Sequence, residues 1–228
     1  MNFFGHAVVA SWQAVDSPGL VLGAMLPDFA TMSQTRLVEV SHPELRAGVE
    51  LHHLTDRVFH GTPRFVALRR EATQILLERG LGRGPSQAVG HVGVELLLDG
   101  CLVEQRKARE AYAAALRSGS DHELGRRIRW LDAEGRARWR TLRARLERHG
   151  PPDDYRDPAV VASRVERILR ARRRLSLDTR RQDIAARYLP ELQQSVQAHA
   201  TPLMAELRQG LIEEIGGPTP RGFLAKAG

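Results

Sequence analysis

Two stretches of the chain place histidine and carboxylate side chains on what should be the apolar face of a helix. In the first, His52, Asp56 and His60 recur at i, i+4 and i+8, so at about 100° per residue they share one side. The same side carries the apolar residues Leu45, Val49 and Phe59. The opposite side carries the charged residues Arg46, Glu50 and Arg57. This pattern constrains the fold, because a buried ionised group is costly unless it is paired, neutralised or bound to a metal.

The second stretch repeats the pattern with His91, Glu95 and Asp99, again at i, i+4 and i+8. Apolar residues share this face as well, namely Val92, Leu98 and Leu102, whereas Glu104 lies opposite. No inward arginine or lysine accompanies either stripe. Of the two interpretations, a metal site and an internal hydrogen-bonded network, we favour the metal site.

Two further residues fit such a site. His6 lies in an otherwise apolar segment, and Asp28 follows a proline at an expected helix end. The candidate ligands are therefore His6, Asp28, His52, Asp56, His60, His91, Glu95 and Asp99, enough donors for two ions. His53 lies at the edge of its stripe and is expected to support the ligands. Mixed imidazole and carboxylate donors suit Mn, Fe, Zn or Mg ions better than a soft thiolate site.

The sequence predicts an all-α fold with about seven to nine helices in a single domain over residues 1–216, followed by a flexible tail at 217–228. The expected helices cover residues 2–14, 18–27 with Ser17 as the cap, 41–61 with Ser41 as the cap, 63–79, 86–116, 121–148, a segment that begins at Asp157-Pro158, and 179–215. No segment shows the alternating pattern of a strand.

Composition limits the functional classes. Cys101 is the only cysteine among 228 residues, which excludes an internal disulfide framework and a cysteine-rich zinc site. No apolar run reaches the roughly 20 residues that a membrane span needs, and we expect a cytoplasmic protein. The net charge of +7 favours acidic partners, although a GC-rich coding bias explains scattered arginines equally well.

Several segments together resemble one known family. The start MNFxxH, the segment GxMxxDF (Gly23 to Phe29), GVxLHxxxD (Gly48 to Asp56) and LLLDGCL (Leu96 to Leu102) are similar in order and spacing to acyl carrier protein phosphodiesterases. The basic stretch from Arg170 and the long helix after it also resemble that family, so the likeness covers most of the chain.

The resemblance implies an all-helical, HD-type phosphohydrolase that prefers manganese and releases 4′-phosphopantetheine from holo acyl carrier protein. It implies a metal site of His6, Asp28, His52, Asp56 and Asp99, with Asp28, Asp56 and His52 in the catalytic centre. It also implies that the basic residues Arg172, Arg173 and Arg174 contact the acidic carrier protein. The chain differs from the family at five positions, which are His53, His60, His91, Glu95 and Gly100.

Two alternatives remain open. One keeps the metal but takes a nucleotide or another small phosphoester as the substrate. The other is a helical nucleic-acid-binding or scaffold protein, whose arginines in 126–148 and 170–181 contact phosphates. Aromatic residues are scarce for stacking on bases, which weighs against this last alternative. The sequence leaves the oligomeric state open.

Overall fold

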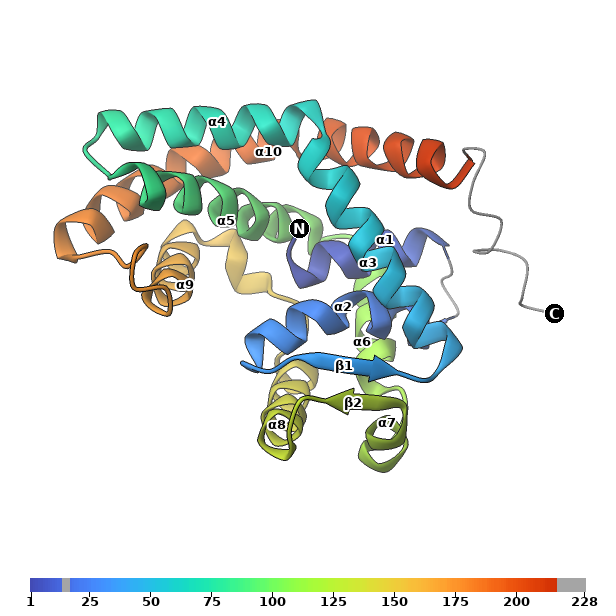
Figure 1. Cartoon of the computed structure of the whole chain (residues 1–228). Helices are drawn as coiled ribbons and strands as arrows, with labels where there is room; N and C mark the ends of the chain where they lie inside the picture. Colours follow the sequence, from blue (N-terminus) through green and yellow to red (C-terminus); the bar gives the residue numbers. More distant parts are fainter. Residues whose placement is uncertain (14–16, 217–228) are drawn as a thin grey trace. The chain divides into compact units, whose positions relative to one another are not determined.

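A computed structural model describes residues 1–13 and 17–216 (Figure 1). Over these residues the chain forms ten α-helices, a short 3-10 helix and two strands. The helices are α1 (Phe3–Gln13), α2 (Pro18–Met32), α3 (Pro43–Gly61), α4 (Pro63–Glu78), α5 (Arg83–Leu102), α6 (Arg106–Arg117), α7 (Asp121–Arg127), α8 (Ala133–His149), α9 (Pro158–Arg170) and α10 (Thr179–Gly216), with η1 (Asp153–Arg156) as the 3-10 helix. The structure is 81% helical, which confirms the all-α prediction. The tail predicted at 217–228 lies outside the described residues.

The strands are β1 (Leu37–Val40) and β2 (Ile128–Trp130), and they pair in antiparallel fashion with Leu37 opposite Trp130. The sequence did not predict them. β2 interrupts the helix expected over 121–148, because Ile128 and Trp130 turn inward and are buried. Strands this short carry too little alternation to be detected in a sequence.

Internal contacts divide the chain into two compact units. Unit 1 comprises Met1–Arg57, Leu102–Pro152 and the stretch that begins at Leu211, and unit 2 comprises Val58–Cys101 and Asp153–Gly210. The core of unit 1 is aromatic, with the rings of Phe3, Phe4, Phe29, Tyr112 and Trp139 in contact in pairs. The core of unit 2 is formed by apolar faces of four helices, including Phe65 and Leu76 from α4, Val94 from α5, Val165 from α9, and Leu192 from α10.

Several predicted helix ends are confirmed by the hydrogen bonds of their caps. The hydroxyl of Ser17 accepts a hydrogen bond from the amide of Leu20 at the start of α2. The carboxylate of Asp157 accepts one from Ala159 at the start of α9, where Pro158 occupies the first helical position. Local capping chemistry therefore fixed these boundaries.

Three predicted boundaries were wrong. α2 does not end at Pro27 but continues to Met32, because Phe29 and Ala30 beyond the proline are buried in the core. Ser41 does not cap α3, since its hydroxyl instead donates to the carbonyl of Arg127. The helix expected over 86–116 is broken between α5 and α6, where Arg109 donates to the carbonyl of the buried Val103.

The glycines of α2 and α3 let the two helices approach closely within unit 1. A Cβ atom on Gly48 would lie 2.6 Å from the Ala24 nitrogen and 2.7 Å from the Cα of Gly23. Real Cβ atoms essentially never come so near to a backbone atom. The backbone of α2 therefore lies directly against the face of α3 that carries His52.

None of the helices in the part of the chain that the structure describes is long and apolar enough to cross a membrane.

Candidate functional site

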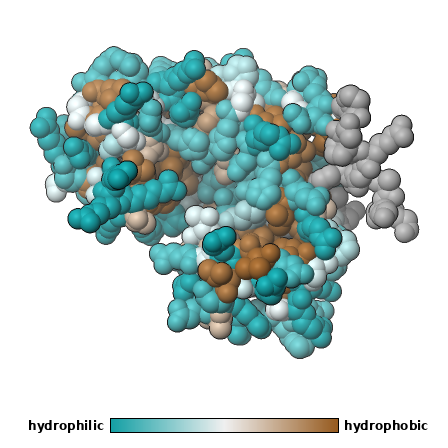
Figure 2. Space-filling model, viewed as in Figure 1, coloured by the Kyte–Doolittle hydropathy of each residue, from teal (hydrophilic) through white to brown (hydrophobic). Residues whose placement is uncertain are grey.

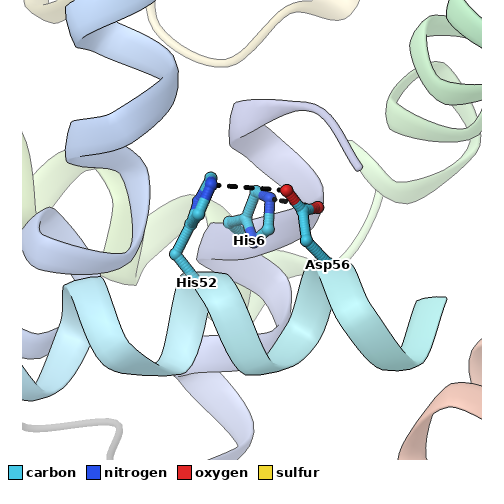
Figure 3. Close-up of side chains that lie close together, drawn as sticks. All are labelled: His6, His52 and Asp56. Carbon is cyan, nitrogen blue, oxygen red and sulfur yellow. Dashed lines mark ion pairs between the residues drawn. The ribbon is translucent and has the colours of Figure 1, made fainter. Parts of the chain in front are cut away.

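Three predicted ligands meet in unit 1. We call His6, His52 and Asp56 the Asp56 group; His6 comes from α1 and the other two from α3 (Figure 3). His6 Nε2 lies 3.3 Å from Asp56 Oδ1, and His52 Nε2 lies 3.5 Å from Asp56 Oδ2. One potential ligand atom from each residue lies within 4.8 Å of the other two, close enough to hold one metal ion.

His6 is placed by the apolar helix α1, nearly all of which is buried. Its ring stacks on the ring of His52, with the two centroids 3.9 Å apart. Its Nε2 also lies 3.8 Å from Oδ2 of Asp28, on α2. The expectation that Asp28 follows a helix end was wrong, since α2 runs on past Pro27. Asp28 nevertheless borders the Asp56 group.

One contact fixes the orientation of the His52 ring. Its Nδ1 lies 2.9 Å from the carbonyl oxygen of Ala24. A carbonyl only accepts hydrogen bonds, so Nδ1 carries the proton and donates it. Burial and the neighbouring His6 lower the pKa of His52 to about 3, so the ring is neutral near pH 7. Its unprotonated Nε2 then lies beside Asp56, and histidine metal ligands commonly have a backbone partner of this kind on the other nitrogen.

Asp56 is the partly open member of the group, with 33% of its side chain exposed. Burial raises the pKa of Asp56, but the hydrogen bond from His6 and the charge of the Met1 amine outweigh it, and the pKa lies well below its usual range. The Met1 nitrogen donates to Oδ1 at 2.8 Å. The carboxylate is therefore ionised, and about one third of its side chain is open to solvent.

Three other predicted ligands meet in unit 2. We call His60, His91 and Glu95 the Glu95 group; His60 comes from α3 and the other two from α5. The Nε2 atoms of His60 and His91 lie 2.9 Å and 3.1 Å from the same oxygen, Oε1 of Glu95. Burial raises the pKa of Glu95, yet hydrogen bonds from both histidines help to hold it well below the usual value.

Comparisons of the chain with protein-family models, with curated proteins and with solved structures found no match.

The predicted ligands therefore meet in a different combination from the one the stripes indicated. The first stripe is divided, because His52 and Asp56 join His6 whereas His60 joins His91 and Glu95. A helical wheel shows which residues share a face, but not which other helix covers each turn of that face. The role of the Ala24 carbonyl, which orients His52, could not be predicted from the sequence, because it is a backbone atom that every residue has.

Asp99 belongs to neither three-residue group. It is fully buried on α5, and its charge contributes to a raised pKa of Tyr155 after the larger effect of burial. The close approach of another backbone segment explains why a glycine stands at position 100, next to Asp99. A Cβ there would lie 2.7 Å from the Tyr155 carbonyl carbon and 3.1 Å from the Arg156 nitrogen. Any side chain at this position would meet that backbone.

His53 lies beside the Asp56 group, its ring centroid 5.3 Å from that of His52. It lines a hollow of about 560 Å³ in unit 1, together with Pro27, Arg46 and the strand β1. Figure 2 shows hydrophobic side chains gathered over β1 on the face in view. The hollow thus combines an apolar wall with charged side chains of both signs.

The basic residues singled out in the sequence are on the surface. Arg172, Arg173 and Arg174 are all exposed in the turn after α9.

In unit 1, a hollow of about 410 Å³ is lined by four arginines, namely Arg126, Arg127, Arg129 and Arg136. One of them, Arg129, pairs with Glu39 at 2.7 Å across the two strands.

Proposed function

We propose that the chain is a divalent-metal-dependent phosphoric ester hydrolase whose ion is held by the Asp56 group. The observation that carries the proposal is the orientation of His52, whose Nδ1 is fixed on the Ala24 carbonyl while Nε2 lies 3.5 Å from Asp56. A neutral imidazole nitrogen and a carboxylate oxygen both offer lone pairs. Two lone pairs that face each other repel, and a cation that binds both atoms removes this repulsion.

The donor set of the group fits a divalent ion. His6 and His52 offer nitrogen, and Asp56 offers oxygen, with Asp28 as a further carboxylate 3.8 Å from His6. This mixture accommodates manganese, our first choice, and also iron, zinc or magnesium. Bound there, a divalent ion supplies the positive charge that polarises a phosphoryl group toward attack by water.

The residues around the ion have two different roles. His6 is fully buried and His52 is fixed by its carbonyl partner, so both serve to position the ion. Asp28 and Asp56 are partly exposed, so a phosphoryl group and a water molecule can approach them from solvent. We assign Asp28 as the carboxylate that accepts the proton of the attacking water.

For the substrate, we propose the phosphopantetheine arm of holo acyl carrier protein. The support is the resemblance of the sequence motifs, which include His6, Asp28, His52 and Asp56. The net charge of +7 and the exposed arginines at 172–174 suit an acidic protein partner.

A second candidate is a small phosphoester such as a nucleotide. The hollow of about 560 Å³ favours it, since this volume lies within the usual range of small-ligand pockets. The hollow is lined by Pro27 and His53, the immediate chain neighbours of Asp28 and His52. Arg46 in the same hollow is a candidate partner for a second phosphate.

A third candidate, nucleic-acid binding without catalysis, is favoured by the arginine-lined hollow of about 410 Å³. It requires affinity that falls steeply with salt and that does not depend on metal.

The experiment compares substrates. Protein freed of metal by a chelator and resupplied with Mn²⁺ is assayed for phosphopantetheine release from holo acyl carrier protein and for phosphate release from nucleotides. We expect release from the carrier protein, and a loss of about 100-fold or more in Asp28→Asn. Asp183→Asn, which changes an exposed aspartate, is the matched control. Activity on nucleotides alone would favour the second candidate, and nucleic-acid binding without any hydrolysis would favour the third.

A further inference from the structure

The Glu95 group has no task in the proposed hydrolase, although it is as tightly assembled as the Asp56 group. Its three ligand atoms lie within 4.8 Å of one another and all belong to unit 2. Two imidazole nitrogens approach one carboxylate oxygen, at 2.9 Å and 3.1 Å. A pair of nitrogens and a carboxylate that converge in this way can hold a metal ion.

The local structure holds these side chains in place. His91 and Glu95 are one helical turn apart on α5, so their side chains emerge on the same face. His60 reaches them from α3, and its ring centroid lies 4.9 Å from that of His91. The ring of Phe65 packs against both imidazoles, with centroids 5.1 Å from His60 and 5.3 Å from His91. Little rearrangement is then needed to bind an ion.

The burial of the group is graded. The Glu95 side chain is 14% exposed, whereas His60 and His91 are 35% and 38% exposed. The carboxylate thus forms the floor of the site and the two imidazoles form its rim. An ion can enter from solvent past the histidines and meet a negative charge at the bottom.

We propose that His60, His91 and Glu95 form a second divalent-metal site with a preference for zinc. Two imidazoles and one carboxylate are a ligand set that zinc takes in sites that keep a fourth position open. Imidazole donors favour zinc over magnesium, which prefers oxygen ligands. The proposal does not rest on the hydrolase assignment, because it concerns different residues and is tested by binding.

The test is a zinc titration of metal-free full-length protein in which the first group has been disabled. The background variant is His52→Gln/Asp56→Asn, whose remaining zinc is counted by calorimetry and by metal analysis after gel filtration. We expect one equivalent of tightly bound Zn²⁺. Adding His91→Gln, a change at the exposed rim, should weaken it by at least about 10- to 100-fold, because even outer partners of ligands have effects of this size.

Controls separate binding from folding. His149→Gln changes an exposed histidine outside both groups and should leave the zinc affinity unchanged. Zn²⁺ should raise the melting temperature of the background variant but not that of the protein that also carries His91→Gln. If the His52→Gln/Asp56→Asn variant binds no zinc while its circular dichroism spectrum is native, the Glu95 group is a hydrogen-bonded network and the proposal is overturned. Equal zinc affinity with and without His91→Gln would also overturn it.

Discussion

The hydrogen bond from Nδ1 to the Ala24 carbonyl sets the orientation of the His52 ring. The opposite nitrogen faces Asp56, and histidines that bind metals commonly have a backbone partner of this kind on their other nitrogen. The stacked ring of His6 adds a second nitrogen to the same space. At the scale of single residues, the site therefore depends on one backbone carbonyl that has no side chain to identify it in the sequence.

The burial of His52 predicts a pH dependence of stability in metal-free protein. Burial and His6 lower its pKa from 6.5 to about 3, so between these values the unfolded chain binds a proton that the folded chain does not. The free energy of unfolding must then fall as the pH falls, by roughly 2 kcal/mol between pH 7 and pH 5. The lowered pKa of Asp56 acts in the same direction at lower pH.

Urea unfolding of chelator-treated protein at pH 7 and pH 5 measures this loss. In His52→Gln the loss should be smaller, while His149→Gln should behave as the wild type does. An identical pH dependence in the wild type and in His52→Gln would show that His52 is not protected from protonation.

At the scale of elements, the close approach of α2 and α3 sets the distance between the Ala24 carbonyl and His52. Gly48→Ala would place a methyl group against the backbone of α2, which cannot move without displacing that carbonyl. We expect the free energy of unfolding to fall by about 1–3 kcal/mol and metal affinity to fall with it. Thermal and chemical unfolding measure the first effect, and a Mn²⁺ titration measures the second.

Gly61→Ala is the matched control, since it lies on the same helix and its Cβ would meet nothing within 4 Å. It should leave stability unchanged or raise it slightly, by up to about 1 kcal/mol, because alanine favours the helix. Equal stability of the two variants would contradict the close packing of the helices.

The backbone around Tyr155 constrains α5 in a similar way. Gly100→Ala should lower the free energy of unfolding by about 1–3 kcal/mol, because its Cβ would lie 2.7 Å from the Tyr155 carbonyl carbon. Gly82→Ala is the control, since only a proline side-chain atom 3.9 Å away would be near its Cβ. Chemical unfolding of both variants measures the difference, and a Gly100→Ala protein as stable as Gly82→Ala would contradict the contact.

The sequence predicted the start of a helix correctly where a capping side chain or a proline next to it determines that start. Ser17 is the cap of α2 in both the prediction and the structure, and the helix predicted to begin at Asp157-Pro158 begins there. Where packing decides, the prediction was wrong: α2 passes through Pro27, and β2 interrupts an expected helix. These outcomes depend on residues far apart in the sequence, such as Leu37 and Trp130, which no local pattern connects.

At the scale of the whole molecule, the all-α fold that holds the site residues followed from helical periodicity. The division of those residues into two groups did not. It required knowing that His6 lies beside His52 and Asp56, whereas His91 and Glu95 lie beside His60, which is a property of the tertiary arrangement. The sequence therefore predicted which of these residues share a helix face, and the structure shows which of them lie close enough to share an ion.

Under the proposed function, hydrolysis depends on an ion that the Asp56 group holds. The most direct test measures the rate of ester hydrolysis against Mn²⁺ concentration for chelator-treated wild type and Asp56→Asn, with Asp183→Asn as the control. We predict that Mn²⁺ restores activity to the wild type and to the control. Asp56→Asn should lose at least about 100-fold in kcat/KM, or require far more Mn²⁺, because a direct ligand matters more than the outer partners whose loss costs 10- to 100-fold. Hydrolysis that persists after chelation, or an Asp56→Asn enzyme with the Mn²⁺ response of the wild type, would contradict the claim.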